Sequence, residues 1–409
     1  MLKIRRNMAE SSVATNQKDI PSELTAMVNK LMRPEGYLWA GFPRFCELFG
    51  RDALITSLQL MRFNTDIPKN SIMALAKLQG NKSDPVNGEE PGKIIHEYYD
   101  HGVDAEFIKY KSPIGWLKPF VPVYFSIDST PLFLITISNY YNVKKDKRLL
   151  DTLMPNILAS INFIINSCEK DGMLKYNKLC NGSSLQSQSW KDGIGNLTDN
   201  LVGPVAVVEV QGYAYMALKS MVPIIRDEGF DGLSDRMDAV ANRIKEAFNK
   251  SFWDAGNEFY HLAIDGHGKK LDIITSNPGH LLFTGIIDKE HADKVVKRLF
   301  KSDMLTPYGI RTHSEHDKNF DEYAYQRGSV WIQDNWIIAQ GLKNMGYMQE
   351  YNTIRECILK LFRELKSAPE YIAVSRSGKI ILPENLPESS RPCDPQAWTI
   401  GAIADFLVD

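Results

Sequence analysis

The stretch SIDSTPLFLITISNYY, residues 126–141, joins a short polar cluster to a segment that is apolar on nearly every side. The apolar part is long enough for about three turns of α-helix. Because a helix that is apolar all round must be buried all round, the stretch predicts an inner helix with polar groups at its start. The same combination recurs along the chain.

Six polar clusters, rich in acids, amides, Trp, Tyr or Gly, precede such segments. They read FGRDALI (49–55), SIDSTPLF (126–133), SWKDGIG (189–195), SNPGHLL (276–282), YAYQRGSVWIQDN (323–335) and LPENLPESSRPCDPQAW (382–398). The buried helices expected with them cover residues 52–62, 131–142, 204–222, 277–286, 329–345 and 395–407. Amphipathic helices with one charged face alternate with these, at residues 22–32, 69–80, 149–166, 233–251, 289–300 and 349–366.

This alternation predicts an all-α fold, an (α/α)6 toroid or barrel in which six inner helices stand inside six outer ones. Residues 252–275 break the pattern: their aromatic alternation and the Gly-rich turn at 265–268 predict a small β-hairpin insertion. We expect residues 1–409 to form a single catalytic domain, with residues 1–20 as a candidate disordered N-terminal segment.

The composition excludes several classes of protein. A net charge of -2 gives no reason to expect nucleic acid as a partner. The five Cys are odd in number and widely spaced, which argues against a disulfide framework or a zinc site. No signal peptide or membrane span of about 20 apolar residues is evident. We expect a cytoplasmic protein with no metal or organic cofactor; the sequence predicts no oligomeric state.

In the expected barrel the six clusters meet at one end, where the inner helices begin. Trp and Tyr rings stack on the C–H faces of sugars, and acids and amides bind hydroxyl groups. The expected ligand is therefore an oligosaccharide or a glycoside. Hydrolysis of such a ligand needs two carboxyl groups on opposite sides of the bond. The candidates are Asp52, Asp128, Asp192, Glu209, Asp334, Glu384 and Glu388.

Two of these carboxyl groups are the best candidates for catalysis. Asp192 follows Trp190, and an indole wall desolvates a carboxyl group and raises its pKa, as a general acid requires. Glu384 lies in a loop stiffened by Pro383 and Pro387, which suits a fixed general base.

Structural explanations stand beside the functional ones. Asp52 would either bind substrate, pair with Arg51 or cap its helix. Glu209 would either face the cavity or be buried against an arginine, since an unpaired buried carboxylate is costly. Other residues have an equally plain structural alternative: His280 as a partner for backbone groups, Trp331 and Trp398 as core side chains, and Glu388 as a solvated loop residue.

The motifs FGRDALI, SIDSTPLF, WKDG followed by EVQGY, PGHLL, TPYGIRT, RGSVWIQDN, LPE and PQAW resemble, in order, those of amylo-α-1,6-glucosidases, the glucosidase part of glycogen debranching enzymes. That family belongs to the (α/α)6 glycosidases with glucoamylase and trehalase. The resemblance covers the chain from about Leu38 onward. It implies an inverting, exo-acting α-glycosidase that most often releases glucose.

The resemblance also implies roles for single residues. It makes Asp192 the general acid and Glu384 the general base. It places the terminal sugar against Arg51 and Asp52. It matches six further residues to other pocket positions: Asp128, Glu209, Gln211, Tyr325, Arg327 and Trp331. Trp190, His280 and Trp398, which stand in the polar clusters, are further candidates for substrate binding.

The chain departs from that family at YQRGSVWIQDN, where relatives often read YHRGSVWPWDN. Gln326 replaces His, and Ile332 and Gln333 replace Pro and Trp. We also expect no N-terminal domain of the kind that many relatives carry, and this expectation favours a short oligosaccharide or glycoside over a branched polymer as the substrate.

Two other functions remain open from the sequence. An (α/α)6 barrel can carry a sugar isomerase or epimerase, usually with paired histidines, and His280 and His313 are candidates for such a pair. A non-catalytic carbohydrate-binding protein would keep the aromatic pocket without needing both catalytic carboxyl groups.

Overall fold

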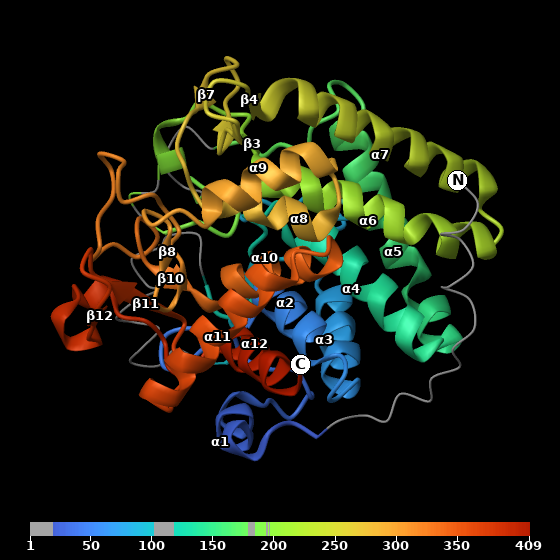
Figure 1. Cartoon of the computed structure of the whole chain (residues 1–409). Helices are drawn as coiled ribbons and strands as arrows, with labels where there is room; N and C mark the ends of the chain where they lie inside the picture. The colour runs from blue at the N-terminus through green and yellow to red at the C-terminus, as the bar shows by residue number, and fades with distance from the viewer. Residues whose placement is uncertain (1–18, 102–117, 179–184, 194, 196) are drawn as a thin grey trace.

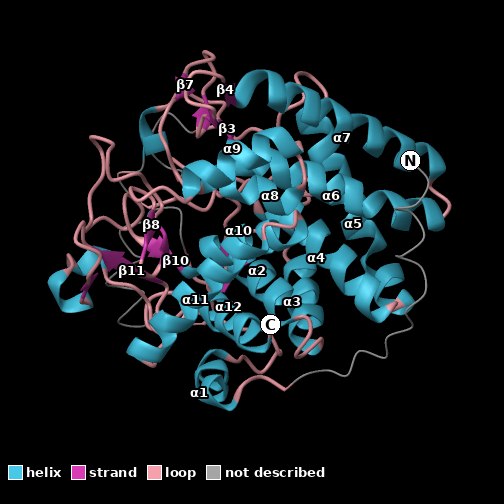
Figure 2. Cartoon of the chain, viewed as in Figure 1, coloured by secondary structure: helices cyan, strands magenta, loops and turns pink. Residues whose placement is uncertain are grey.

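The structure is a computed structural model that describes residues 19–101, 118–178, 185–193, 195 and 197–409. Most of the segment expected to be disordered, residues 1–18, lies outside the described residues. The described part contains twelve α-helices, with short strands in the loops between them (Figures 1 and 2).

Six helices form a closed inner ring, in which each helix contacts the next and α12 contacts α2. They are α2 (Gly50–Leu60), α4 (Ser129–Lys144), α6 (Val208–Asp227), α8 (His280–Thr284), α10 (Ile332–Asn344) and α12 (Ala397–Val408). In α4, every residue from Ser129 to Ser138 is buried. The ring is therefore made of the segments that were predicted to be buried on all sides.

The other six helices pack outside this ring, each beside an inner helix or the loop that leads into one. They are α1 (Ser22–Leu31), α3 (Asp66–Lys77), α5 (Lys147–Cys168), α7 (Asp231–Phe252), α9 (Lys289–Leu299) and α11 (Met348–Leu365). Only one face of each is buried; in α9 the buried residues are Ala292, Val295, Val296 and Leu299. The predicted all-α (α/α)6 architecture is confirmed.

One inner helix is much shorter than predicted. The sequence indicated a helix over residues 277–286, but α8 covers only five residues after a 3-10 turn at Asn277–Gly279. Gly285 has a φ of +68°, a left-handed conformation that glycine adopts easily, and the helix ends there.

The predicted β-insertion is present and consists of two hairpins instead of one. β4 (Trp253–Asp254) pairs with β5 (Phe259–Tyr260), and β6 (Ala263–Ile264) pairs with β7 (Lys270–Leu271). β6 also pairs with β3 (Ala206–Val207), which leads directly into α6. The insertion is thereby attached to the start of an inner helix.

The remaining strands were not predicted. Most of them have only two residues, which is too short for an alternating pattern, and some pair with a segment that is distant in the sequence. β1 (Leu48–Phe49) pairs with β2 (Glu97–Tyr98), and β8 (Leu305–Thr306) pairs with β9 (Gly309–Ile310). β10 (Val330–Trp331), β11 (Tyr371–Val374) and β12 (Ile380–Ile381) form a three-stranded sheet. β1 and β10 lead into the inner helices α2 and α10, so their partners lie at the same end of the barrel.

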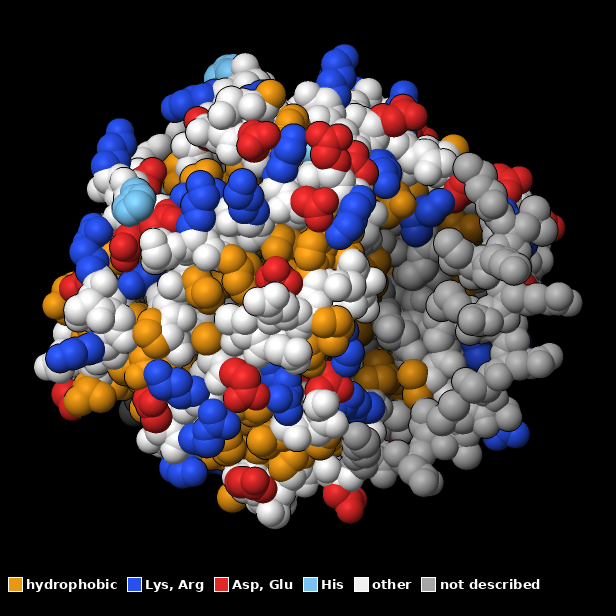
Figure 3. All heavy atoms as spheres, viewed as in Figure 1, with side chains coloured by type: hydrophobic (Ala, Val, Ile, Leu, Met, Phe, Trp, Pro, Cys, Tyr) orange, Lys and Arg blue, Asp and Glu red, His pale blue; other side chains and the backbone are white. Residues whose placement is uncertain are grey.

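The face of the molecule in Figure 3 carries Lys and Arg side chains interspersed with Asp and Glu. This mixture agrees with the small net charge of the chain. Among the described helices, α5 is long and apolar enough to cross a membrane, but half of its most apolar window is buried. It contacts α4 and α7, as an outer helix of the barrel does.

Candidate active site

A cavity of about 470 Å³ opens where several inner helices begin. Four of the six polar clusters contribute to its wall, through the loops before α6, α10 and α12 and the first turns of α2 and α12. The residues that line it are Arg44, Phe45, Phe49, Arg51, Asp52, His96, Glu97, Leu185, Trp190, Asp192, Gly193, Tyr325, Trp331, Glu370, Ser389, Ser390 and Trp398. A cavity of this size suits a small ligand such as a monosaccharide joined to a short second group.

The other two clusters lie behind the wall. Asp128, from the cluster that begins α4, and His280, from the cluster that begins α8, are both fully buried and do not line the cavity. The predicted meeting of the clusters at one end of the barrel is therefore confirmed for four of them.

Arg51 connects the wall to the residues behind it. Its Nε donates to Asp128 Oδ2 at 2.8 Å, and its Nη1 donates to Asp192 Oδ2 at 2.9 Å. Asp128 also accepts a hydrogen bond from Ser126 Oγ at 2.6 Å. Asp128, which lies behind the wall, thus fixes the Arg51 guanidinium in a position where it also binds Asp192.

Asp192 lies on the loop before α6 and lines the same cavity as Trp190. Burial raises the pKa of Asp192, whereas the charge and hydrogen bond of Arg51 act in the opposite direction. A carboxyl group with a raised pKa in a Trp-walled cavity can hold a proton and transfer it to a bound ligand.

Asp52 is not paired with Arg51 by a hydrogen bond, one of the roles considered from the sequence. Its Oδ1 accepts from Gln396 Nε2 at 2.9 Å, which ties the first turn of α2 to the residue before α12. Burial raises the pKa of Asp52 well above its usual value, and the charge of Arg51 opposes this rise.

The second carboxyl group of the cavity is Glu370, which the sequence did not single out. It precedes β11, is 2% exposed, and accepts a hydrogen bond from the hydroxyl of Tyr325. Its Oε2 also accepts from the backbone N–H of Cys393 at 3.2 Å. Burial raises its pKa to about 7, against the hydrogen bond from Tyr325 and the charge of Arg44.

Glu384 is not in the cavity. It is exposed on a 3-10 turn, Pro383–Asn385, and it is absent from the cavity wall. The prediction that Glu384 faces Asp192 across a common cavity is contradicted, because the prolines beside it hold a solvated turn. Glu388 is exposed as well, in agreement with the structural alternative considered for it.

Trp190, Trp331, Trp398 and Tyr325 form the aromatic part of the wall. Trp331 contacts Trp190 edge-on at 5.6 Å and Trp398 edge-on at 5.9 Å between ring centroids. The three indoles are nearly fully buried and pack on one another, so Trp331 and Trp398 are core side chains with an edge at the cavity.

Several residues predicted to bind substrate do not line the cavity. Gln211 is fully buried and completes backbone hydrogen bonds, since its amide contacts Leu174 N, Leu174 O and Val207 O. Arg327 pairs with Asp321 at 3.4 Å. Neither Gln211 nor Arg327 lines the cavity. Asp128 does not line it either, but Asp128 binds Arg51, which does.

Glu209 and His280 lie deeper in the barrel. His280 contacts the Tyr213 hydroxyl and Asp334 Oδ1 at 2.7 Å each, and its ring stacks on that of Trp190. Its partners are side chains, not the backbone groups considered from the sequence. Burial raises the pKa of the fully buried Glu209, and interaction with His280 opposes the rise.

Sequence reasoning missed Arg44, His96, Glu97 and Glu370. A usable signal existed for Glu370: it stands between Pro369 and the apolar run YIAV (371–374), where an acid at the end of a buried strand is unusual. No comparable local signal marks the other three residues.

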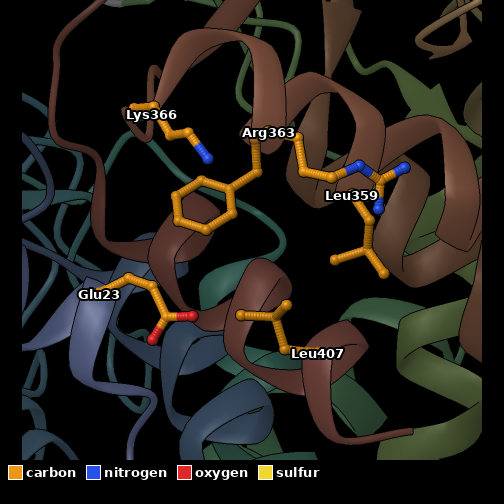
Figure 4. A pocket seen from close by; sticks show the side chains of 6 residues that line it. Glu23, Leu359, Arg363, Lys366 and Leu407 are labelled. Atoms are coloured by element: carbon orange, nitrogen blue, oxygen red, sulfur yellow. The ribbon is translucent and has the colours of Figure 1, made fainter.

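A second cavity of about 380 Å³ lies between α1, α11 and the end of α12 (Figure 4). Its lining residues are Glu23, Leu359, Phe362, Arg363, Lys366 and Leu407. It offers a single carboxylate and no aromatic wall of Trp or Tyr, so it lacks the paired acids that characterise the first cavity.

The chain is similar to known proteins over much of its length. A family model described as the mannosylglycerate hydrolase MGH1-like glycoside hydrolase domain matches residues 116–373. The chain is 26% identical over 132 residues to a mannosylglycerate hydrolase of Rubrobacter radiotolerans, and 35% identical over 105 residues to mannosylglycerate hydrolase MGH1 of Selaginella moellendorffii. These alignments cover 31% and 26% of this chain, and only 30% and 21% of the two relatives.

Solved structures agree with the fold. A GH63 mannosylglycerate hydrolase from Thermus thermophilus, in complex with Tris, superposes with a TM-score of 0.72 at 15% identity, over 95% of this chain and all of that one. The same enzyme with Tris and D-glycerate gives a TM-score of 0.71, over 95% of this chain and 99% of that one. At this identity the likeness establishes a shared (α/α)6 architecture.

Proposed function

Because the chain belongs to the mannosylglycerate hydrolase MGH1-like glycoside hydrolase family, we propose that it is an inverting, exo-acting enzyme that releases one hexose from a short α-glycoside with an acidic aglycone such as glycerate. Its class, a glycoside hydrolase, is the class expected from the sequence. The narrower expectation, an amylo-α-1,6-glucosidase of the glycogen-debranching type, is corrected by the family match, which is to the mannosylglycerate hydrolase MGH1-like domain.

One observation carries the proposed mechanism: Asp192 and Glu370 line the same cavity, and each has a hydrogen-bonded partner that fixes its position. Glycoside hydrolysis with inversion needs a proton donor on one side of the bond and a base for water on the other, about 6.5–9.5 Å apart. In the proposed reaction Asp192 protonates the glycosidic oxygen, and Glu370 removes a proton from the attacking water.

The environments of the two groups support this division of roles. Asp192 is desolvated by burial in the cavity that Trp190 also lines, which favours its protonated form. Glu370 receives hydrogen bonds from Tyr325 and from the Cys393 N–H, which favour its ionised form and leave it able to accept a proton near neutral pH. Glu370 therefore replaces Glu384 as the proposed base.

The charged residues of the cavity support an acidic aglycone. Arg51 is engaged by Asp128 and Asp192. Arg44 lies half-buried in the wall, donates to the Ser389 carbonyl at 3.2 Å and interacts with Glu370. A guanidinium at the cavity wall suits a carboxylate, which it can bind with two parallel hydrogen bonds. We assign Arg44 to the carboxylate of the aglycone.

For the released sugar, the names of the matched relatives favour mannose, and the sequence resemblance favours glucose. A structure of the Thermus thermophilus enzyme in complex with glucose adds support for a glucose-sized site. The isomerase alternative loses its support, because neither His280 nor His313 is in the cavity wall. His313 is buried near Asp317, and burial lowers its pKa to about 4.

Proton NMR on the purified chain tests the proposal. Mannosylglycerate and glucosylglycerate are offered beside maltose and isomaltose, and the β-anomer of the free hexose is expected to appear first. Asp192→Ala and Glu370→Ala should each lower kcat by about 10²–10⁴-fold, whereas Glu384→Ala should retain wild-type turnover. Formation of a ketose, initial release of the α-anomer, or loss of turnover in Glu384→Ala alone would overturn the proposal.

A further inference from the structure

The β-insertion brings three potential metal ligands together outside the cavity. Asp254 ends β4, His261 follows β5, and Asp272 follows β7. One ligand atom from each of these residues lies within 4.8 Å of the other two. Three segments of the insertion therefore each contribute one potential metal ligand to the same small region.

His261 is the member of this group that the fold alone does not explain. Its side chain is 9% exposed, and its Nδ1 has no hydrogen-bond partner among the described residues. The atom lies 3.7 Å from Asp272 Oδ1, too far for a hydrogen bond. Two atoms that each lie about 2.1 Å from one metal ion are at most about 4.2 Å apart, so this spacing suits two ligands of one ion.

The neighbouring polar groups have partners within the insertion. Asp254 Oδ1 accepts from the Gly256 N–H at 2.9 Å. Asn257 Nδ2 donates to Asp254 Oδ2 at 2.7 Å and to Asp272 at 3.2 Å. The side-chain amide N–H groups of Asn257 thus lie between the carboxylates of Asp254 and Asp272, a position in which a cation is also stabilised. Rotation of this amide would direct its oxygen toward the same position.

The charge around the group is negative on balance. Asp254 and Asp272 are both acids, and Asn257 adds no charge. Lys270 lies close enough to His261 to act against a cation, but it is exposed, so solvent screens its charge.

We propose that Asp254, His261 and Asp272 form a binding site for one divalent transition-type cation, of which Zn²⁺ or Mn²⁺ fits best. One imidazole and two carboxylates are a ligand set that such ions accept. The ion links β4, β5 and β7 and so stabilises the insertion that is paired to the start of α6 through β3. None of the three ligands lines the cavity, so the ion takes no part in glycoside hydrolysis.

The test uses the full chain without an affinity tag, dialysed against EDTA and then freed of chelator. Titration calorimetry with ZnCl2 and with MnCl2 should give one bound ion per chain, and thermal unfolding should move to higher temperature with the ion. Asp272→Asn should weaken binding by at least 10-fold, since changing groups that only orient metal ligands already costs about 10–100-fold.

Two variants make the test specific. His267→Ala, at an exposed histidine in the turn between β6 and β7, should bind the ion like the wild type. His261→Ala should abolish binding; if it does not fold, Asp272→Asn decides, because Asp272 is 54% exposed and its replacement leaves the packing unchanged. No binding to the wild-type chain, or equal binding by Asp272→Asn, would overturn the proposal. Turnover of the glycoside is not needed for either result.

Discussion

The hydroxyl of Tyr325 donates a hydrogen bond to the carboxylate of Glu370, and both side chains line the same cavity. Tyr325 belongs to the polar cluster before α10, and Glu370 precedes β11, which pairs with β10. The strand pairing therefore brings a tyrosine and an acid together that the sequence separates. The hydrogen bond favours the ionised form of Glu370, whereas burial favours the protonated form.

Tyr325→Phe should raise the pKa of Glu370 above its value of about 7, because the hydrogen bond that stabilises the carboxylate is lost. The base must be ionised to act, so the acid limb of kcat/KM against pH should move to higher pH. Tyr323→Phe, at an exposed tyrosine, serves as the control and should leave the profile unchanged. An unchanged acid limb in Tyr325→Phe would argue against Glu370 as the base.

Glu370→Gln should change how stability depends on pH. The folded-state pKa of Glu370 is raised from 4.5 to about 7, so the wild-type protein loses stability as pH rises through this range, by about 3 kcal/mol. The amide has no proton to release, and it can still accept from Cys393 and donate to Tyr325. Urea unfolding at pH 5 and pH 8 should show that the free energy of unfolding of the variant, relative to that of the wild type, is larger at pH 8 than at pH 5. Parallel pH dependence would contradict the raised pKa.

Much of the barrel could be predicted because its information is local. An inner helix such as α4 is apolar on every side, and an outer helix such as α9 has one apolar face, so each reveals its layer within a few turns of sequence. The end of α8 at Gly285 was missed because the apolar residues continue past it, although the backbone turns there.

The catalytic pair could be predicted only in part, for a physical reason. Asp192 was found because its desolvating neighbour, Trp190, is close to it in the sequence. Glu370 and Glu384 both follow a proline, and only the apolar run 371–374 after Glu370 distinguishes the two acids in the sequence. The pairing of β10 with β11 brings the residue before β11, Glu370, to the cavity, and such pairing between distant segments is not visible in a single sequence.

Arg44→Gln should lower the preference for an acidic aglycone. Loss of a charged hydrogen-bonded partner is expected to reduce kcat/KM for mannosylglycerate or glucosylglycerate by about 10- to 100-fold. Arg44 also lowers the pKa of Glu370, so the comparison must use the methyl glycoside of the same sugar as a neutral control. An equal loss for the acidic and the neutral substrate would show that Arg44 acts on the base and not on the aglycone.

Gln211→Leu should lower stability without changing the chemistry. The substitution leaves the N–H and the carbonyl of Leu174 without their buried partners, which is expected to cost about 2–4 kcal/mol of unfolding free energy. KM and the activity per folded molecule should stay near wild-type values. A raised KM with unchanged stability would restore Gln211 to the substrate-binding residues implied by the family resemblance.

Gln326 holds the loop that carries Asp192. Its Oε1 accepts from the Gly193 N–H at 2.9 Å, and its Nε2 donates to the Trp190 carbonyl at 2.8 Å. One side chain therefore binds the backbone on both sides of Asp192. The contact is close: a Cβ at Gly193 would lie 2.7 Å from the ring of Tyr325 and 3.0 Å from Gln326 Oε1. Gln326 is therefore a positioning residue for the proposed acid.

Gln326→Leu should lower kcat by about 10- to 100-fold and leave KM little changed, because a displacement of about 1 Å in a catalytic group costs rate more than binding. Gln326→Glu keeps the acceptor for Gly193 but cannot donate to Trp190, so its kcat should fall less than that of Gln326→Leu. Amide hydrogen exchange at Gly193 should rise in Gln326→Leu, which a loss of bulk alone would not cause. If Gly193 stays protected while kcat falls, or kcat stays at the wild-type value, Gln326 does not position Asp192.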